Sequence, residues 1–303
     1  MSNAKEIKRK IWSIKNTGKI TKAMELISTV KMKKAQDLAL GKREFVLEML
    51  KIFLRVEGFL DDFPLFNEGK WDKTLALVIT SNKGLCGGYN VNVMKQVNKY
   101  VKDTGEDLEF IAIGKKAANF VAKTGNKLVA DFSADFTDNI EPLFTKNISK
   151  LYKDEFLSGK YKKVVVFYNH YINTIKQVPV AKVSLPIDSK EIKTYLTKIV
   201  EDYVDLEKEI ESLGDIYNYD LEPTPEALAN EVIPMILDMI FYDIILEAKA
   251  SEHSSRMIAM KNAKDSAKKI SDKLTLQYNK ARQAIITQEV SEISAGVEAM
   301  KDV

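Results

Sequence analysis

Apolar residues in the first part of the chain recur at alternating steps of three and four, with one step of seven. The clearest run consists of Leu38, Phe45, Met49, Ile52, Val56 and Phe59. This heptad-like spacing is typical of a helix that buries one narrow stripe against a partner helix. A helix over residues 3–58 would be roughly 80 Å long, which is longer than a compact domain of this size requires.

Nearer the N-terminus the apolar stripe changes its phase by one residue. The stripe begins with Ile7, Ile11 and Ile14 and resumes, displaced, with Ile20, Met24 and Ile27. The displacement flanks the sequence Asn-Thr-Gly at 16–18, where Gly18 lowers helix stability by about 1 kcal/mol relative to alanine. Ile20, Met24 and Ile27 are thus interpreted as the continuation of the stripe, and we expect the helix to be locally soft at Gly18.

The end of the chain shows the same spacing, and residues 235–295 contain neither glycine nor proline. The stripe consists of Leu246, Ala250, His253, Met257, Met260, Ala267, Leu274, Tyr278, Ala281 and Ile285, with interruptions at Lys264 and Ser271. The alanines Ala250, Ala267 and Ala281 permit close approach of a second helix. A helix from Glu226 to Ala299 would be roughly 110 Å long, and Pro234 should kink it or mark a restart.

A long helix is unstable in water unless its apolar stripe is buried. We therefore expect the two ends of the chain to bury each other as an antiparallel or crossing coiled coil, with the middle of the chain closing the loop between them.

The middle of the chain alternates between β-rich runs and helical patterns. The predicted strands are Thr74–Thr80, Leu108–Gly114 and Val164–Asn169, with Thr174–Val183 as an extra strand near a sheet edge. The predicted helices are Val91–Lys102, Lys115–Lys123 and Ile140–Phe156, and Asp188–Asp220 is interpreted as a helix followed by a loop. This alternation indicates a small, mainly parallel α/β sheet.

The predicted fold class is α/β plus long helices: an antiparallel coiled coil of the terminal helices with a small Rossmann-like α/β domain inserted between them. The expected division is a coiled-coil helix over residues 1–60, an α/β domain over 70–190, a connection over 191–225 and a second coiled-coil helix over 226–303.

Composition and charge limit the classes of partner that the chain could bind. The net charge is only +3, but residues 1–43 carry twelve Lys or Arg against three acids, so this end should lie beside an acidic surface. The basic stretch around Lys31, Lys33 and Lys34 has no interleaved aromatic residues, and docking to an acidic protein is a better interpretation than nucleic acid binding. No apolar run is long enough to span a bilayer, and no secretory signal is evident.

Residues 81–90, SNKGLCGGYN, follow a predicted strand and precede a predicted helix. The glycines Gly84, Gly87 and Gly88 could expose backbone N–H groups to a phosphate, but the spacing fits neither standard nucleotide-binding motif. A tight turn that requires positive φ is the favoured interpretation. The single cysteine, Cys86, has no histidine near it in sequence and is interpreted as a partly buried small residue.

No catalytic constellation or metal site stands out. The two histidines, His170 and His253, lie far apart in sequence, and His253 belongs to the apolar stripe. No carboxylate pair is set in apolar surroundings. The sequence therefore gives no positive indication of an enzyme, and we expect no cofactor and no metal.

Several sequence blocks resemble the gamma subunit of rotary F-type ATP synthases. They lie in order along essentially the whole chain, at Lys5–Ile7, Ile20–Glu25, Lys31–Gln36, Gly84–Asn90, Ala248–His253, Arg256–Ala263 and Tyr278–Glu289.

The resemblance implies a non-catalytic rotor shaft that couples rotation of the membrane c-ring to conformational change in three catalytic beta subunits. It implies alpha, beta, epsilon and c subunits as partners, and a peripheral location through the c-ring at the cytoplasmic face of the cell membrane. Residues in the positions of contacts with the alpha–beta ring are Lys19, Lys22, Met24, Arg282, Gln283, Thr287, Gln288 and Glu289.

Two alternatives stay open at this point. One is a gamma-like shaft of a paralogous rotary ATPase that does not transport ions. The other is an α/β protein that binds a nucleotide at its glycine loop and oligomerises through a helical arm.

Overall fold

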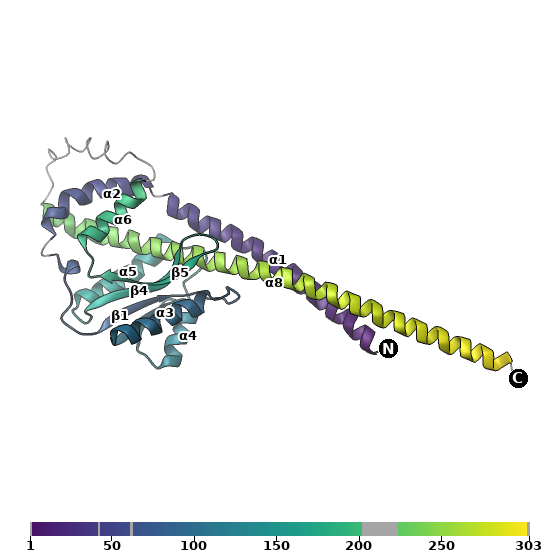
Figure 1. Cartoon of the computed structure of the whole chain (residues 1–303). Coiled ribbons are helices and arrows are strands. Elements are labelled where there is room, and N and C mark those ends of the chain that lie inside the picture. The colour runs from purple at the N-terminus through teal and green to yellow at the C-terminus, as the bar shows by residue number, and fades with distance from the viewer. Residues whose placement is uncertain (1, 42, 61–62, 202–223, 302–303) are drawn as a thin grey trace. The chain divides into compact units, whose positions relative to one another are not determined.

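The computed structural model describes residues 2–41, 43–60, 63–201 and 224–301, which form two compact units (Figure 1). The helical unit comprises Met1–Thr29 with Arg256–Val303, and the α/β unit comprises Val30–Ser255. Two helices, α1 (Ser2–Leu40) and α8 (Pro225–Lys301), contribute to both units. The boundaries predicted at 60 and 226 do not coincide with this division, because residues 30–60 and 226–255 pack within the α/β unit.

In the helical unit, α1 and α8 run antiparallel. Lys264 Nζ of α8 lies 2.7 Å from Glu25 Oε2 of α1, and a Cβ placed on Gly18 would lie 3.7 Å from Ala267 Cβ. The residue numbers rise along α8 as they fall along α1, which confirms the predicted antiparallel pairing. The C-terminal end of α8 extends past the N-terminal end of α1 (Figure 1).

The inward face of α1 differs from the predicted one. Most of its buried and half-buried positions within the helical unit follow one stripe: Ile7, Ile11, Ile14, Gly18, Thr21, Glu25 and Ser28. Ala4, Asn16 and Met24 are half-buried as well. Ile20 and Ile27, which we expected in the seam, are 61% and 52% exposed. The predicted phase change is therefore wrong, because small and polar residues continue the stripe where the sequence shows no apolar ones.

The inward face of α8 follows the predicted stripe more closely. Met260 and Ala267 are buried, and Met257, Leu274, Tyr278, Ala281 and Ile285 are half-buried. Lys264 and Ser271 do not interrupt this stripe but belong to it, since Ser271 is buried and Lys264 pairs with Glu25. The small side chain of Ala267 packs close to Gly18, as expected for a residue that permits close helix approach.

The single helix predicted over residues 3–58 is two helices. Helix α1 ends at Leu40 and α2 (Arg43–Val56) begins at Arg43. The backbone N–H of Gly41 donates to the Asp37 carbonyl at 3.1 Å, which closes the last turn of α1. Two short 3₁₀ helices, η1 (Glu57–Phe59) and η2 (Pro64–Phe66), follow α2.

The α/β unit contains a five-stranded sheet in the order β3-β2-β1-β4-β5. Its strands are β1 (Thr74–Ile79), β2 (Leu108–Ile113), β3 (Leu128–Asp131), β4 (Lys163–Tyr171) and β5 (Gln177–Leu185). The first four strands are parallel, and β5 is an antiparallel edge strand. The predicted strands and the mainly parallel sheet are confirmed. Strand β3 was missed because it has only four residues, all half-buried or exposed.

Helices cover both faces of this sheet. The helices of the unit that follow β1 in sequence are α3 (Tyr89–Thr104), α4 (Lys115–Thr124), α5 (Pro142–Leu157) and α6 (Ser189–Glu201). Helices α3 and α4 pack on Ala76, Val78 and Phe167 of one face. The other face packs on α2, α5, α6 and the first part of α8. Because both faces are covered, every residue of β1 and β2 is buried, and all of them are apolar apart from Thr74 and Glu109.

Helix α8 continues through Pro234, so the predicted restart is wrong. The Pro234 carbonyl accepts a hydrogen bond from Lys153 Nζ of α5 at 3.2 Å, and the same ammonium group pairs with Asp238 at 2.5 Å. The helix predicted after Asp188 is α6, whereas the loop predicted to follow it lies outside the described residues from 202 onward.

Candidate partner-binding surfaces

The contact residues predicted on α1 lie on the outward side of the helical unit. Lys19 and Lys22 are exposed, and Met24 is half-buried next to the seam residue Glu25. The seam spacing places these side chains outside, because Gly18, Thr21 and Glu25 occupy the inward positions. This arrangement offers two ammonium groups and one thioether to a partner surface.

The contact residues predicted on α8 form a second group. Arg282, Gln283, Thr287, Gln288 and Glu289 are all exposed. Gln288 Nε2 donates to Glu292 Oε1 one turn further along, at 2.9 Å. Arg282 follows Lys264 by eighteen residues, or roughly 27 Å of helix. The structure therefore does not bring the two predicted groups together: they lie at different levels of the coiled coil.

Exposed apolar residues extend the outward face of α1 beyond the predicted contacts. Trp12, Ile20, Leu26 and Ile27 are each more than half exposed within the helical unit. A solvent-exposed apolar face of this kind on a helix is typical of an interaction surface. Sequence reasoning missed it, because it assigned Ile20 and Ile27 to the seam.

The glycine loop after β1 turns sharply into α3. Gly87 has a φ of +57°, and the non-glycine residue Leu85 has a φ of +62°. Gly88 has a φ of −81° and forms the N-cap of α3. The positive φ that we predicted for this turn thus occurs at Gly87 and Leu85. Leu85 projects from the loop and is exposed, whereas Cys86 is buried.

Side-chain amides occupy the hydrogen-bonding groups at the base of this loop. The Ser81 backbone N–H donates to Asn90 Oδ1 at 2.9 Å, and the Lys115 backbone N–H donates to Asn82 Oδ1 at 2.7 Å. Asn82 Nδ2 also donates to the carbonyls of Ser133 and Phe136 at 2.9 and 2.8 Å. A phosphate would need such N–H groups for itself. The loop geometry therefore favours a structural turn over a nucleotide cradle.

Asp138, in the loop between β3 and α5, joins α1 and α8 within the α/β unit. Its carboxylate lies 2.5 Å from Lys31 Nζ, 3.7 Å from Lys249 Nζ and 3.3 Å from His253 Nε2. The neighbouring His253, together with Lys31 and Lys249, holds the pKa of Asp138 well below its usual range despite partial burial. Lys31, which we expected to meet an acidic partner, meets an acid of its own chain.

Asp138 and His253 also lie close to Glu252, and these three residue types can ligate metals. However, Lys249 Nζ lies 3.3 Å from Glu252 and 3.8 Å from the centre of the Phe136 ring. The lysine ammonium groups therefore supply the positive charge that balances these two carboxylates, and the cluster is best described as an ion-pair network.

Comparison with known proteins places the chain in a family. A family profile described as ATP synthase matches residues 3–300. A protein of Roseiflexus sp. (strain RS-1) named "ATP synthase gamma chain" is 34% identical, and the match covers 100% of both chains. A protein of Akkermansia muciniphila with the same name is 35% identical over 99% of this chain and 100% of its own. The chain belongs to the ATP synthase gamma chain family.

Solved structures of ATP synthase rotors share the fold of this gamma chain. The match to a chain from the Euglena gracilis mitochondrial ATP synthase, in a structure of OSCP, F1 and the c-ring, has a TM-score of 0.65. It covers 99% of this chain and 95% of that chain at 17% identity. A chain from the Tetrahymena thermophila central stalk and c-ring matches with a TM-score of 0.53 at 24% identity, covering 80% and 99%. The resemblance inferred from the sequence is confirmed.

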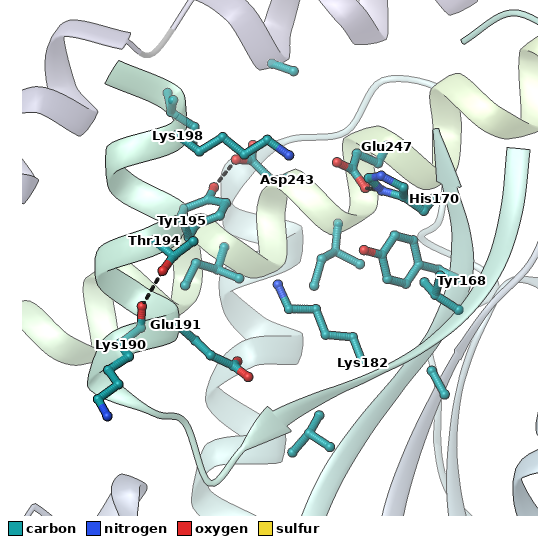
Figure 2. Close-up of a pocket in the computed structure, with 17 residues that line it drawn as sticks. Tyr168, His170, Lys182, Lys190, Glu191, Thr194, Tyr195, Lys198, Asp243 and Glu247 are labelled. Atoms are coloured by element: carbon teal, nitrogen blue, oxygen red, sulfur yellow. Dashed lines mark hydrogen bonds and ion pairs between the residues drawn. The ribbon is translucent and has the colours of Figure 1, made fainter. Parts of the chain in front are cut away.

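The gamma chain also has a groove of about 900 Å³ in the α/β unit, between β4, β5, α6 and α8. Two pairs of its polar side chains lie together in Figure 2: Tyr195 donates to Asp243, and His170 Nδ1 lies 2.8 Å from Glu247 Oε2. The glycine loop does not line this groove.

Among the helices in the described part of the chain, none is both long enough and apolar enough to cross a bilayer.

Proposed function

We propose that this gamma chain is the central rotor shaft of a rotary F-type ATP synthase, with alpha, beta, epsilon and c subunits as its partners. In this role it carries rotation of the c-ring to three catalytic beta subunits and performs no bond chemistry itself. It would be attached to the membrane peripherally, through the c-ring, at the cytoplasmic face.

The observation that carries this proposal is the outward-facing surface of the helical unit, in a chain that matches gamma chains over their whole length. Lys19 and Lys22 are exposed on α1, where the apolar residues Ile20 and Ile27 are also exposed, and Arg282 is exposed further along α8. A pair of helices with one basic and partly apolar side presents a different surface at each rotational angle.

An asymmetric shaft can drive a cycle because its contacts with each beta subunit depend on the angle. A contact that is stronger in one conformation than in another shifts the equilibrium between the two by that difference. Lysine side chains opposite an acidic surface attract it over a distance without interlocking, which suits a part that must turn.

Met24→Lys tests this assignment. The added charge at a half-buried position beside Glu25 should slow ATP hydrolysis by the complex reconstituted with alpha and beta subunits, while assembly survives. Met24→Leu is the matched control, since it keeps an apolar side chain of similar size, and it should hydrolyse ATP at the rate of the unchanged complex. Equal rates of ATP hydrolysis for Met24→Lys and Met24→Leu would show that Met24 is not part of the contact surface.

The rival function is nucleotide binding by the isolated chain at the loop of residues 81–90. Titration calorimetry of the purified chain with MgATP should give no binding heat, because asparagine side chains occupy the N–H groups of Ser81 and Lys115. Binding that is lost in Gly87→Ala would favour the rival. A shaft from a motor not coupled to ion transport is distinguished by proton or sodium pumping in membrane vesicles.

A further inference from the structure

Helix α1 carries two stripes, either of which could face α8. One is small and polar, with Gly18, Thr21, Glu25 and Ser28. The other is displaced by one residue, which is about 100° of rotation around the helix axis, and contains Ile20, Met24 and Ile27. Burial of apolar area alone would place the second stripe in the seam. The structure places the first stripe there and leaves Ile20 and Ile27 largely exposed.

The charges in the seam distinguish the two arrangements. In the helical unit, the inward positions of α1 are Ile7, Ile11, Ile14, Gly18, Thr21, Glu25 and Ser28. Those of α8 are Met257, Met260, Lys264, Ala267, Ser271, Leu274, Tyr278, Ala281 and Ile285. Arg256, the first α8 residue of the helical unit, is also buried. Among the seam positions between Met257 and Ile285 and the described inward positions of α1, each helix has one charged residue, and the two are paired: Lys264 Nζ lies 2.7 Å from Glu25 Oε2.

The other seam residues at this level are small and specify orientation weakly. Gly18 packs against Ala267, and Thr21 Oγ1 donates to the Gly18 carbonyl of its own helix at 3.0 Å. A rotation of α1 by one residue would place Met24 opposite Lys264 and carry Glu25 away from it. The ammonium group would then remain in the seam without its carboxylate. Single polar positions are known to set the alignment of coiled coils in this way.

We propose that the Glu25–Lys264 ion pair fixes the rotational phase of α1 against α8 and thereby holds Ile20 and Ile27 on the outside, with Met24 half-buried beside the seam. Glu25 and Lys264 are positioning residues: they act on a partner only through the side chains that they turn outward. The choice of phase is independent of the proposed function, and only the statement that the outward stripe meets the alpha–beta ring rests on it.

Disulfide formation in the full-length chain reports the phase directly. A Cβ on Gly18 would lie 3.7 Å from Ala267 Cβ, within the range of about 3.5–4.5 Å that disulfides adopt. Gly18→Cys with Ala267→Cys therefore reports the observed phase. Thr17→Cys with Ala267→Cys reports the alternative phase. Thr17 is exposed in the observed phase, and a rotation of α1 by one residue would bring it to the place of Gly18 opposite Ala267. Both pairs are placed in a Cys86→Ala background, which removes the single native cysteine.

Charge reversal then tests the pair. Lys264→Glu should lower the rate of the 18–267 disulfide by about tenfold or more, because two carboxylates would meet in the seam, and it should raise the rate of the 17–267 disulfide. Glu25→Lys combined with Lys264→Glu should restore the original preference. The matched control is Lys268→Glu, an equal charge change at an exposed position one turn further along α8, which should change neither rate.

Lys264→Met provides a second variant that introduces no repulsion, and circular dichroism checks that every variant keeps its helix content. Lys264→Met should shift the preference in the same direction as Lys264→Glu, since Glu25 then favours solvent over the seam. The proposal is overturned if both Lys264 variants keep the 18–267 preference unchanged, or if the folded charge swap fails to restore it.

Discussion

Glu109 is a buried carboxylate on β2. The loss of folding stability that its replacement would cause can be worked out from the structure. It is 4% exposed. Its Oε1 accepts from Lys73 Nζ at 2.7 Å, and its Oε2 accepts from Lys127 Nζ at 2.9 Å and from the Tyr161 hydroxyl at 2.8 Å. Glu109→Gln keeps the shape of the side chain, but it removes the charge and turns one acceptor oxygen into a donor.

The lowered pKa of Glu109 gives the magnitude of its contribution to folding stability. Burial alone would raise this pKa, but the hydrogen bonds from Lys127, Lys73 and Tyr161 outweigh it and lower the pKa from 4.5 to about 2. That difference corresponds to roughly 3 kcal/mol of stability. Because the two lysine side chains are 49% and 68% exposed, solvent screening reduces the expected loss in Glu109→Gln to about 1–2 kcal/mol.

The sign of the pH dependence follows from the lowered pKa. The contribution is fully present above the ordinary pKa of 4.5 and is lost as the pH falls toward 2. Urea unfolding of the full chain should therefore show the variant less stable at pH 7 and the difference shrinking below pH 4.5. Asp107→Asn, which alters an exposed neighbour of the same Lys73, is the control and should be nearly neutral. Equal stability at pH 7, or a difference that persists unchanged at pH 3, would refute this reasoning.

Two further predictions concern the turn after β2 and the tip of α8. Gly114→Ala should destabilise the chain by about 3 kcal/mol or more, because φ is +103° and the new Cβ would lie 2.2 Å from the Thr80 carbonyl oxygen. Gly84→Ala is the control, because a Cβ at Gly84 would meet open space. Its free energy of unfolding in a urea titration should lie within about 0.5 kcal/mol of that of the unchanged chain. Removal of the residues after Gln288 should leave a complex that assembles and rotates with lower torque, because residues 286–295 of α8 are all exposed and the seam up to Ile285 survives. Loss of assembly would contradict it.

Most of the sheet could be predicted from the sequence because its signals are local. Runs of mostly apolar residues mark β1, β2 and β4, since both faces of the sheet are covered. Strand β3 gave no such signal, being short and half-buried or exposed. The end of α1 at Leu40 was also missed, although Gly41 was a visible candidate for a helix C-terminus.

The inward face of α1 could not be predicted from apolar spacing, because it depends on a contact between residues far apart in sequence. Ile20 and Ile27 formed the more apolar stripe, but Glu25 pairs with Lys264 and turns that stripe outward. The same limit applies to Asp138, whose partners Lys31 and His253 come from the two ends of the chain. The exposed positions of Lys22 and Arg282 agree with a role in contacting partners, which stays a prediction.

Rotation of the chain inside an assembled complex is the most direct test of the shaft function. A probe attached through Ile175→Cys would be selective, because Ile175 is 85% exposed and the single native cysteine is buried. With the alpha and beta subunits fixed to a surface, addition of ATP should turn the probe continuously in one direction. A complex that hydrolyses ATP at its full rate while the probe stays at one angle would contradict the proposed function.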